Sequence, residues 1–381
     1  MSERDEGKPE SPAPSAAQAP ESGGEGSVLP SGAVVRGPGS DPEPGAGWSR
    51  RKVLTAAGIG AGALVAAGGS AGWWFLRKDT AELRLAHGGG VCEAPLYVAY
   101  EKGFFAKEGL KVTLSKVGGQ EDTHAAVGSG KYAGTPGIFF SWLKPIEDGQ
   151  NVKLVAGLHE GCLRLVVLKD GPIKEVGQLR GKKIGVSGLQ GSALNFFSLD
   201  LLDAGIAPSP DAKQVQWVVY DDDALPKALE KGDIDAIAAS DPVALLPVSS
   251  GQAVVLSDNM HGHNAEQYCC ATALNGDLVR ARPGVARKLV TAWAEGSRWI
   301  GESKANLQET ADIEAGRNYV AGTREQIEGA LSTYSFHPSA KKLKPALIPG
   351  IEKFAKTGFL DPDTDPHKLA DKVYGDLGLD W

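Results

Sequence analysis

The sequence lacks the motifs that mark common enzyme classes. Its 381 residues contain no Ser-His-Asp order, no nucleophile elbow and no phosphate-binding Walker loop, so hydrolase and nucleotide-hydrolysing activities have no support. An excess of basic residues is also missing, since 47 Asp and Glu outnumber 40 Lys and Arg and the net charge is −7. The composition therefore argues against nucleic acid as a partner. We expect no catalytic residue, no cofactor and no metal ligand.

Large apolar side chains are almost absent from residues 1–47, which are rich in Pro, Gly, Ser, Ala and Glu. Such a segment cannot bury enough apolar surface to offset the entropy of ordering, so we expect a disordered tail. Over the whole chain, 42% of the residues are hydrophobic and 23% are charged, and the large apolar residues lie almost entirely after position 47. The rest of the chain is long enough for a sizeable core and for two lobes.

Charged residues are absent from the run Val53 to Leu76, which Arg77 and Lys78 close. At roughly 1.5 Å per residue this run spans about 36 Å, enough to cross a hydrocarbon core. The preceding Ser49-Arg50-Arg51 resembles the start of a twin-arginine export signal. We therefore expect residues 48–80 to be such a signal or a membrane anchor.

Cleavage of this segment and its retention as a tether both remain open. Gly69-Ser70-Ala71 is a small-x-small site, and no lipoprotein cysteine follows the run, since Cys92 lies too far downstream. In either case the folded part is expected outside the cell membrane, and retention would tether it there by residues 53–76.

The stretch Lys182 to Leu202 predicts a strand, a tight loop and a helix. A β-branched run leads into the small residues Ser187 to Ser192, and apolar residues then recur through Leu202. A helix that starts at Gly and Ser leaves backbone N–H groups unpaired, and the helix dipole adds partial positive charge there. The loop can cradle an anionic or strongly polar group, although an ordinary capped turn has the same sequence features.

Several motifs occur in a characteristic order along the chain. Residues 102–110 read KGFFAKEGL, residues 179–186 read LRGKKIGV, and residues 228–242 read ALEKGDIDAIAASDP. This order resembles the periplasmic solute-binding proteins of nitrate, sulfonate and taurine type, which are the receptors of ABC importers. The thiamine-pyrimidine synthases belong to the same superfamily. The resemblance extends from about Leu83 to the C-terminus.

The resemblance implies a periplasmic-binding-protein fold of type II, with two α/β lobes. Strands alternate with helices along the chain, and this favours parallel-rich sheets. We expect lobe one to comprise residues 81–168 and 269–381, and lobe two to comprise residues 169–268. A small ligand would lie in the cleft between them, and the protein would act as a monomer that delivers it to a membrane permease.

The resemblance also implies which residues face the ligand. The loop that ends at Ser192 would grip a sulfonate, nitrate or taurine-like head group through N–H and hydroxyl donors. Carboxyl groups in the same neighbourhood would also suit an amine or a cation, so the charge of the ligand stays open. The expected ligand-binding residues are Gly90, Cys92, Glu93, Pro136, His159, Glu160, Gln190, Gly191, Ser192 and Asp241.

The four cysteines allow more than one interpretation. In an exported protein they indicate disulfides or buried thiols first, and four cysteines permit three pairings. A bond between neighbouring Cys269 and Cys270 is strained, which favours Cys92 with Cys162, or either of these with one of the pair. A thiolate and imidazole site for a soft metal is the second interpretation, although no Cys-x-x-Cys spacing supports it.

A synthase-like enzyme that uses the cysteine and histidine set is the alternative function. The dense cysteine motif of the thiamine-pyrimidine synthases is absent from the corresponding stretch Ser187 to Ser192. The acidic run Asp221-Asp222-Asp223 is interpreted as the cap of the helix that follows it, and not as a metal site.

Overall fold

The computed structural model describes residues 82–118, 121–189, 191–261 and 268–381. The expected disordered tail and the expected export or anchor segment, residues 1–47 and 48–80, lie outside these ranges. Within them, no helix combines the length and the hydropathy that a membrane span needs.

Lobe one is built on a five-stranded sheet in the order β2-β1-β3-β10-β4. The first strand shows why the segment is extended, since Leu83 and Leu85 are buried while Arg84 between them is exposed. The strands of this sheet are β1 (Leu83–His87), β2 (Val112–Lys116), β3 (Gly134–Ile138), β4 (Val152–His159) and β10 (Cys270–Asn275).

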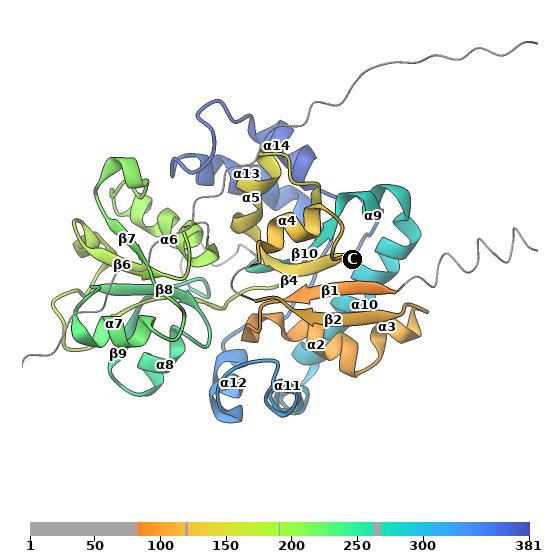
Figure 1. The fold of residues 1–381 in the computed structure, drawn as a ribbon, viewed down its shortest axis with the longest axis horizontal. Helices are drawn as coiled ribbons and strands as arrows, with labels where there is room; N and C mark the ends of the chain where they lie inside the picture. The colour runs from red at the N-terminus through yellow and green to blue at the C-terminus, as the bar shows by residue number, and fades with distance from the viewer. Residues whose placement is uncertain (1–81, 119–120, 190, 262–267) are drawn as a thin grey trace, which may run out of the picture. The chain divides into compact units, whose positions relative to one another are not determined.

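Lobe two is built on a second five-stranded sheet in the order β7-β6-β8-β5-β9. Figure 1 shows the two sheets as separate bodies, with the strands of lobe two on the left. The strands of this sheet are β5 (Leu163–Leu168), β6 (Lys183–Val186), β7 (Gln216–Val219), β8 (Ala236–Ser240) and β9 (Ala253–Asp258). The strand β5 falls within residues 81–168, the range expected for lobe one, yet it pairs only within the second sheet.

Both sheets are mixed rather than parallel-rich. In lobe one β1 pairs in parallel with β2 and β3, whereas β10 pairs antiparallel with β3 and β4. Lobe two repeats this arrangement around β6 and β5. The physical reason is that the chain leaves lobe one after β4 and returns at β10, so each lobe gains strands that are not part of a βαβ unit.

The helices of lobe one pack mainly around α10 (Pro283–Glu302), whose apolar face contacts α2 (Ala94–Glu101) and α3 (Phe104–Lys107). The sequence from Leu96 to Lys107 predicts a single helix, but the structure has two, because Gly103 adopts a φ of 71° between them. The other helices before α10 are η1 (Val91–Glu93), α4 (Thr123–Gly128), η2 (Phe139–Trp142), α5 (Leu143–Glu147) and α9 (Gly276–Ala281).

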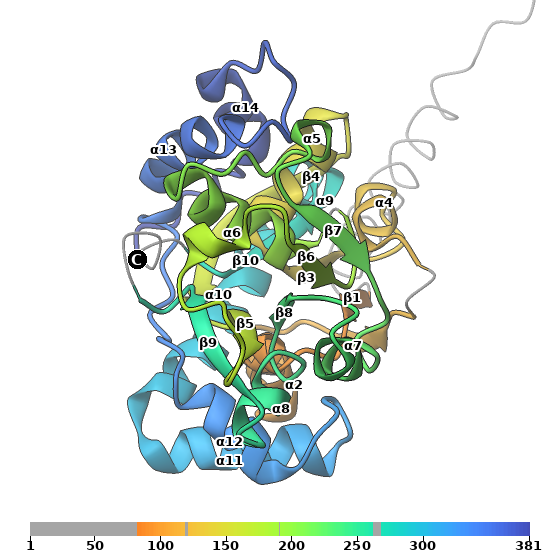
Figure 2. The same cartoon turned by 90° about the vertical axis from the view of Figure 1, so that its left-hand side faces the viewer.

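The remaining helices belong to lobe two or to the C-terminal region. Figure 2 and Figure 1 agree that α11 and α12 lie at the opposite end of the described part from α13 and α14. In lobe two these elements are η3 (Val176–Leu179), α6 (Ser192–Asp203), η4 (Pro210–Ala212), α7 (Leu225–Lys231) and α8 (Leu245–Ser249). In the C-terminal region they are α11 (Lys304–Gly316), α12 (Arg324–Leu331), α13 (Leu343–Ala355) and α14 (Pro366–Val373).

Candidate functional site

A cavity of about 260 Å³ lies between the two lobes and takes its lining from both. Lobe one contributes the loop after β1, the end of β3 and the start of β10. Lobe two contributes the start of α6 and the loops that follow β7 and β8. The lining residues are Gly88, Gly89, Gly90, Cys92, Glu93, Pro136, Ile138, Ser192, Asp222, Ser240, Asp241, Pro242, Val243 and Cys270.

Six of the ten residues expected to bind ligand meet in this cavity. They are Gly90, Cys92, Glu93, Pro136, Ser192 and Asp241. Three others do not line it, namely His159, Glu160 and Gly191. Gln190 lies outside the described residues.

A larger hollow of about 430 Å³ is lined by residues of lobe two alone, among them Gly181, Lys213 and Trp217, so it does not depend on the interlobe arrangement.

Glu93 organises the lobe-one side of the cavity. Its carboxylate accepts the backbone N–H groups of Gly88, Gly89 and Gly90 at 2.9, 2.7 and 2.9 Å. It also accepts the hydroxyl of Tyr97 at 2.8 Å. Burial raises the pKa of Glu93, and these donors oppose that rise. The N–H groups of the glycine loop are therefore already paired and are not free to hold an anion.

The lobe-two side presents a helix start of the opposite character. Gly191 is the N-cap of α6, and no side chain caps this helix. The first N–H groups of an α-helix have no intrahelical acceptor, and the helix dipole makes this end partially positive. Ser192, the first residue of α6, lines the cavity. The start of α6 can therefore pair with an anionic group.

Asp222 is a lining residue that the sequence interpretation assigned to another role. The acidic run before α7 was expected to cap that helix, but the N-cap is Ala224 and no side chain caps it. The carboxyl of Asp222 instead accepts a hydrogen bond from Ser187. Partial burial, together with Asp223 and Asp221, raises its pKa. The carboxyl thus adds negative charge to the cavity, a role that its sequence neighbours hide.

Asp241 lines the cavity but is already paired with Arg164. The Nε and Nη2 atoms of Arg164 donate to its carboxylate at 2.9 and 3.1 Å, and Tyr334 donates its hydroxyl at 2.9 Å. Burial raises the pKa of Asp241, and the contacts with Arg164 and Tyr334 oppose this rise. Arg164 and Tyr334 were not predicted, although a single Arg within the apolar run of β5 is a signal that could have identified the first.

His159 is fully buried behind the cavity wall rather than exposed to a ligand. Its Nε2 atom bonds the carbonyl of Cys92 at 2.8 Å, and its ring stacks on Tyr334. Burial lowers the pKa of His159, but the adjacent Cys270 and Cys92 outweigh this and raise it to about 9. Glu160 is half-buried and exchanges backbone hydrogen bonds with Ser335 at 3.0 and 3.1 Å. Both residues therefore support the structure around the cavity.

The four cysteines converge beside this cavity, and all are buried and free. Cys92 and Cys270 line it. The Sγ atoms of Cys162 and Cys269 lie 2.6 Å apart. Cys92 contacts both Cys162 and Cys270 through its thiol. The family resemblance implies that the four cysteines lie near the cleft, and the structure brings them together from three distant segments.

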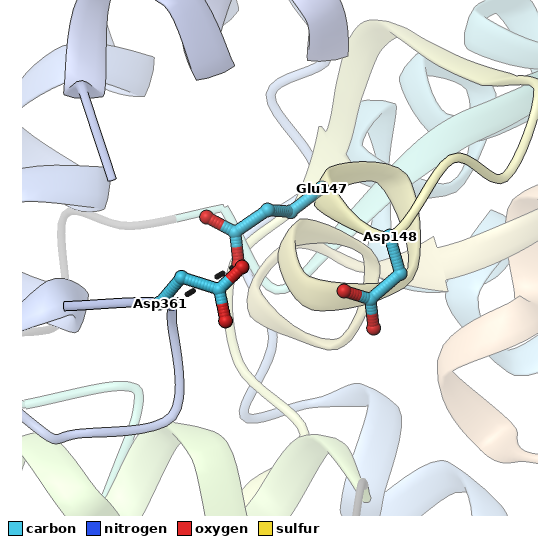
Figure 3. Close-up of side chains that lie close together, drawn as sticks. All are labelled: Glu147, Asp148 and Asp361. Carbon is cyan, nitrogen blue, oxygen red and sulfur yellow. Dashed lines mark hydrogen bonds between the residues drawn. The ribbon is translucent and has the colours of Figure 1, made fainter. Parts of the chain in front are cut away.

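An acidic group that could attract a cation lies elsewhere, where Glu147, Asp148 and Asp361 come together (Figure 3). The Nζ atom of Lys144 lies 3.1, 2.8 and 2.7 Å from these carboxylates. A lysine ammonium therefore already pairs with all three carboxylates.

Comparison with known proteins identifies the family. The family model described as NMT1/THI5 like matches residues 93–304, more than half of the chain. A 4-amino-5-hydroxymethyl-2-methylpyrimidine phosphate synthase from Aspergillus parasiticus is 27% identical over 295 residues, covering 72% of this chain and 81% of the synthase. The bicarbonate-binding protein CmpA of Synechococcus elongatus is 26% identical over 256 residues, 59% of this chain, and the match spans only 55% of CmpA.

The fold also matches solved structures of binding proteins. The alkanesulfonate-binding protein SsuA from Xanthomonas axonopodis pv. citri, bound to MOPS, superposes with a TM-score of 0.62 at 17% identity. The match covers 77% of this chain and 98% of that protein. The resemblance noted in the sequence is thereby confirmed at the level of family and fold, and the chain belongs to the NMT1/THI5-like family.

Proposed function

We propose that the protein is the extracytoplasmic solute-binding receptor of an ABC importer, a monomer that closes its lobes over a small solute and presents it to a membrane permease. The cavity between the lobes carries this proposal, because both lobes line it and its volume of about 260 Å³ suits a small molecule. The bicarbonate-binding and alkanesulfonate-binding relatives support the same class of function.

The charge around the cavity favours a zwitterionic solute over a simple anion. The lining contains the carboxyl groups of Glu93, Asp222 and Asp241, and no Lys, Arg or His occurs among its described residues. Arg164 neutralises Asp241, which leaves two carboxyl groups without a cationic partner. The uncapped start of α6 would hold the acidic end of the solute, and Glu93 and Asp222 would attract its ammonium end. A taurine-like molecule combines both groups.

The synthase relative raises an enzyme as the alternative. The Cys270 thiol in the lining contacts the His159 imidazole, a pairing that a nucleophilic enzyme would also use. The His159 ring, however, is fully buried, and its Nε2 atom is already bonded to the carbonyl of Cys92. We therefore propose binding without catalysis.

A calorimetric screen of the full-length chain tests the proposal. The panel contains nitrate, bicarbonate, methanesulfonate, taurine and ethylamine, so that anions, a zwitterion and a cation are compared at similar size. We expect taurine to bind more tightly than methanesulfonate or ethylamine, because only taurine satisfies both sides of the cavity. Tight binding of methanesulfonate alone would leave a receptor but reject the zwitterion. Absence of binding across the panel, and across aliphatic amino acids, would reject the receptor.

A further inference from the structure

The chain passes between the two lobes at two crossovers, and a described cysteine lies in each. The first crossover joins β4, which ends at His159, to β5, which begins at Leu163, and Cys162 lies within it. The second leads from β9 to β10, and Cys269 lies immediately before β10 begins at Cys270. Lobe closure in two-lobed binding proteins bends such crossovers, so a link between these two cysteines would act at the hinge.

The separation of the two sulfur atoms distinguishes three states of this pair. The Sγ atoms of Cys162 and Cys269 are 2.6 Å apart. A disulfide needs about 2.05 Å, two unbonded atoms need roughly 3.5 Å or more, and two thiolates on one tetrahedral zinc ion lie about 3.7 Å apart. The bond requires a shift of about half an ångström, whereas either of the other states requires the pair to separate by about 1 Å. The distance therefore favours the bond.

Backbone hydrogen bonds hold both cysteines where they are. The N–H of Cys269 donates to the backbone carbonyl of His159 at 3.0 Å, and the carbonyl of Cys269 accepts the N–H of Phe139 at 2.9 Å. The carbonyl of Cys162 accepts the N–H of Asp241 at 3.0 Å. Cys162 also has a φ of 118°, a positive backbone angle that residues other than glycine rarely adopt. The fold thus maintains an unfavourable backbone at the residue whose thiol meets Cys269.

We propose that Cys162 and Cys269 form a disulfide that joins the two interlobe crossovers, while Cys92 and Cys270 remain thiols at the cavity. One S–S bond forms and both thiols lose their protons. The two electrons pass to a disulfide oxidant, either a small-molecule disulfide or a thiol oxidoreductase, which leaves as two thiols. The contact with Cys162 helps to lower the pKa of Cys269 to about 7 against the effect of burial, and this provides a thiolate for the exchange.

The bond would enclose the whole of lobe two. All five strands of the second sheet lie between Cys162 and Cys269, which are 107 positions apart. A cross-link over so long a loop restricts the unfolded chain strongly. Reduction is therefore expected to lower the melting temperature by roughly 10 °C. It is also expected to free the crossovers to bend independently.

Thiol counting by mass spectrometry tests the bond without any ligand, so its result is independent of the proposed receptor function. The full-length chain is incubated with oxidised glutathione, denatured in an alkylating reagent and mapped by peptides. We expect two alkylated cysteines, Cys92 and Cys270, and one cross-linked peptide pair that contains Cys162 and Cys269. After reduction all four cysteines should be alkylated.

The variants Cys162→Ser and Cys269→Ser should lose the cross-link and the melting-temperature shift on reduction, whereas Cys92→Ser should keep both. If Cys162→Ser or Cys269→Ser does not fold, the peptide map of the wild-type chain still shows whether the disulfide forms. Four alkylated cysteines before reduction would overturn the proposal, as would a bond to Cys92 or Cys270. A stoichiometric metal ion retained by the thiols would overturn it as well.

Discussion

Two glycine-containing loops occupy equivalent places in the two lobes but treat their backbone donors differently. The lobe-one loop, residues 88–90, follows β1, and the lobe-two loop, residues 187–191, follows β6. Each of these strands has a parallel neighbour on both sides. In lobe one the donors are paired with Glu93, whereas in lobe two the following helix has no side-chain cap.

This difference shows that a glycine loop at a strand end does not by itself make an anion site. The backbone donors of the lobe-one loop are bound internally by the Glu93 carboxyl group, which itself lines the cavity, so these donors are not available to an anion. The lobe-two loop keeps the partially positive helix end available. Under the proposed function, the start of α6 in lobe two would hold the acid group of the solute, and lobe one would face its ammonium group.

Removal of Glu93 should lower the stability of the protein more than any other substitution to be tested. It would leave the lobe-one loop without a side-chain acceptor for its backbone donors, as in the lobe-two loop. The variant Glu93→Ala leaves three backbone N–H groups and the Tyr97 hydroxyl without their acceptor. We expect the free energy of unfolding to fall by about 3–5 kcal/mol. Urea denaturation measures this. Glu160→Ala is the control, since Glu160 is only half-buried, and its loss should stay below about 1 kcal/mol. Equal losses would contradict the role given to Glu93.

Acidification should also act through lobe one. His87 ends β1, is 4% exposed, and lies 3.1 Å from the Tyr97 hydroxyl. Burial, with a contribution from Lys116, lowers its pKa from 6.5 to about 4. The unfolded chain then binds the proton more readily than the folded one between pH 6.5 and 4. Stability attributable to this group is therefore present above pH 6.5 and lost as the pH falls toward 4.

The loss from His87 is expected to reach up to about 3 kcal/mol. Unfolding free energies measured from pH 7 to pH 4 should show a shallower decline for His87→Gln than for the unmodified chain. Burial also lowers the pKa of His124, so His124 should contribute equally to the decline in both proteins. Parallel curves for the two proteins would show that His87 does not contribute.

Conversely, an acidic residue at the start of α6 should give the lobe-two loop a carboxylate acceptor like the one in the lobe-one loop. The variant Ser192→Glu brings a carboxylate to the uncapped N–H groups, as Glu93 does in lobe one. We expect taurine affinity to fall about 100-fold while the melting temperature stays the same or rises slightly. Ser192→Gln has a similar size without the charge and should lose less than about tenfold. Calorimetry compares the two, and similar affinities for both variants would exclude an acid group at this helix end.

Much of the fold was predictable because its strands are short apolar runs separated by clear turn residues. The strand and the helix predicted within Lys182 to Leu202 occur as β6 and α6. The mixed sheets were not predicted, because hydrophobic periodicity carries no information on strand direction. The break at Gly103 was missed, since a glycine within an apolar helical pattern is often tolerated.

The candidate site was predictable only where backbone position decides a residue's place. Glu93 and Ser192 follow strand ends, and these ends meet at the cavity. His159 is the last residue of β4, but its ring points inward to the carbonyl of Cys92, and this direction depends on packing with Tyr334. Asp222 shows the converse, because three consecutive acids do not reveal which carboxyl faces the cavity. Side-chain direction in loops therefore needs the tertiary structure.

The smallest difference between the loops lies in the conformation of their glycines. Gly89 has a φ of 93°, and a Cβ atom there would lie 3.1 Å from both the Lys116 side chain and the Tyr319 carbonyl. The variant Gly89→Ala is therefore expected to lower the free energy of unfolding by about 1–2 kcal/mol. A Cβ atom at Gly188 in the lobe-two loop would meet nothing within 4 Å, so Gly188→Ala should change stability by less than about 0.5 kcal/mol. Urea denaturation of both variants measures this contrast. A larger loss for Gly188→Ala than for Gly89→Ala would contradict the constraint assigned to Gly89.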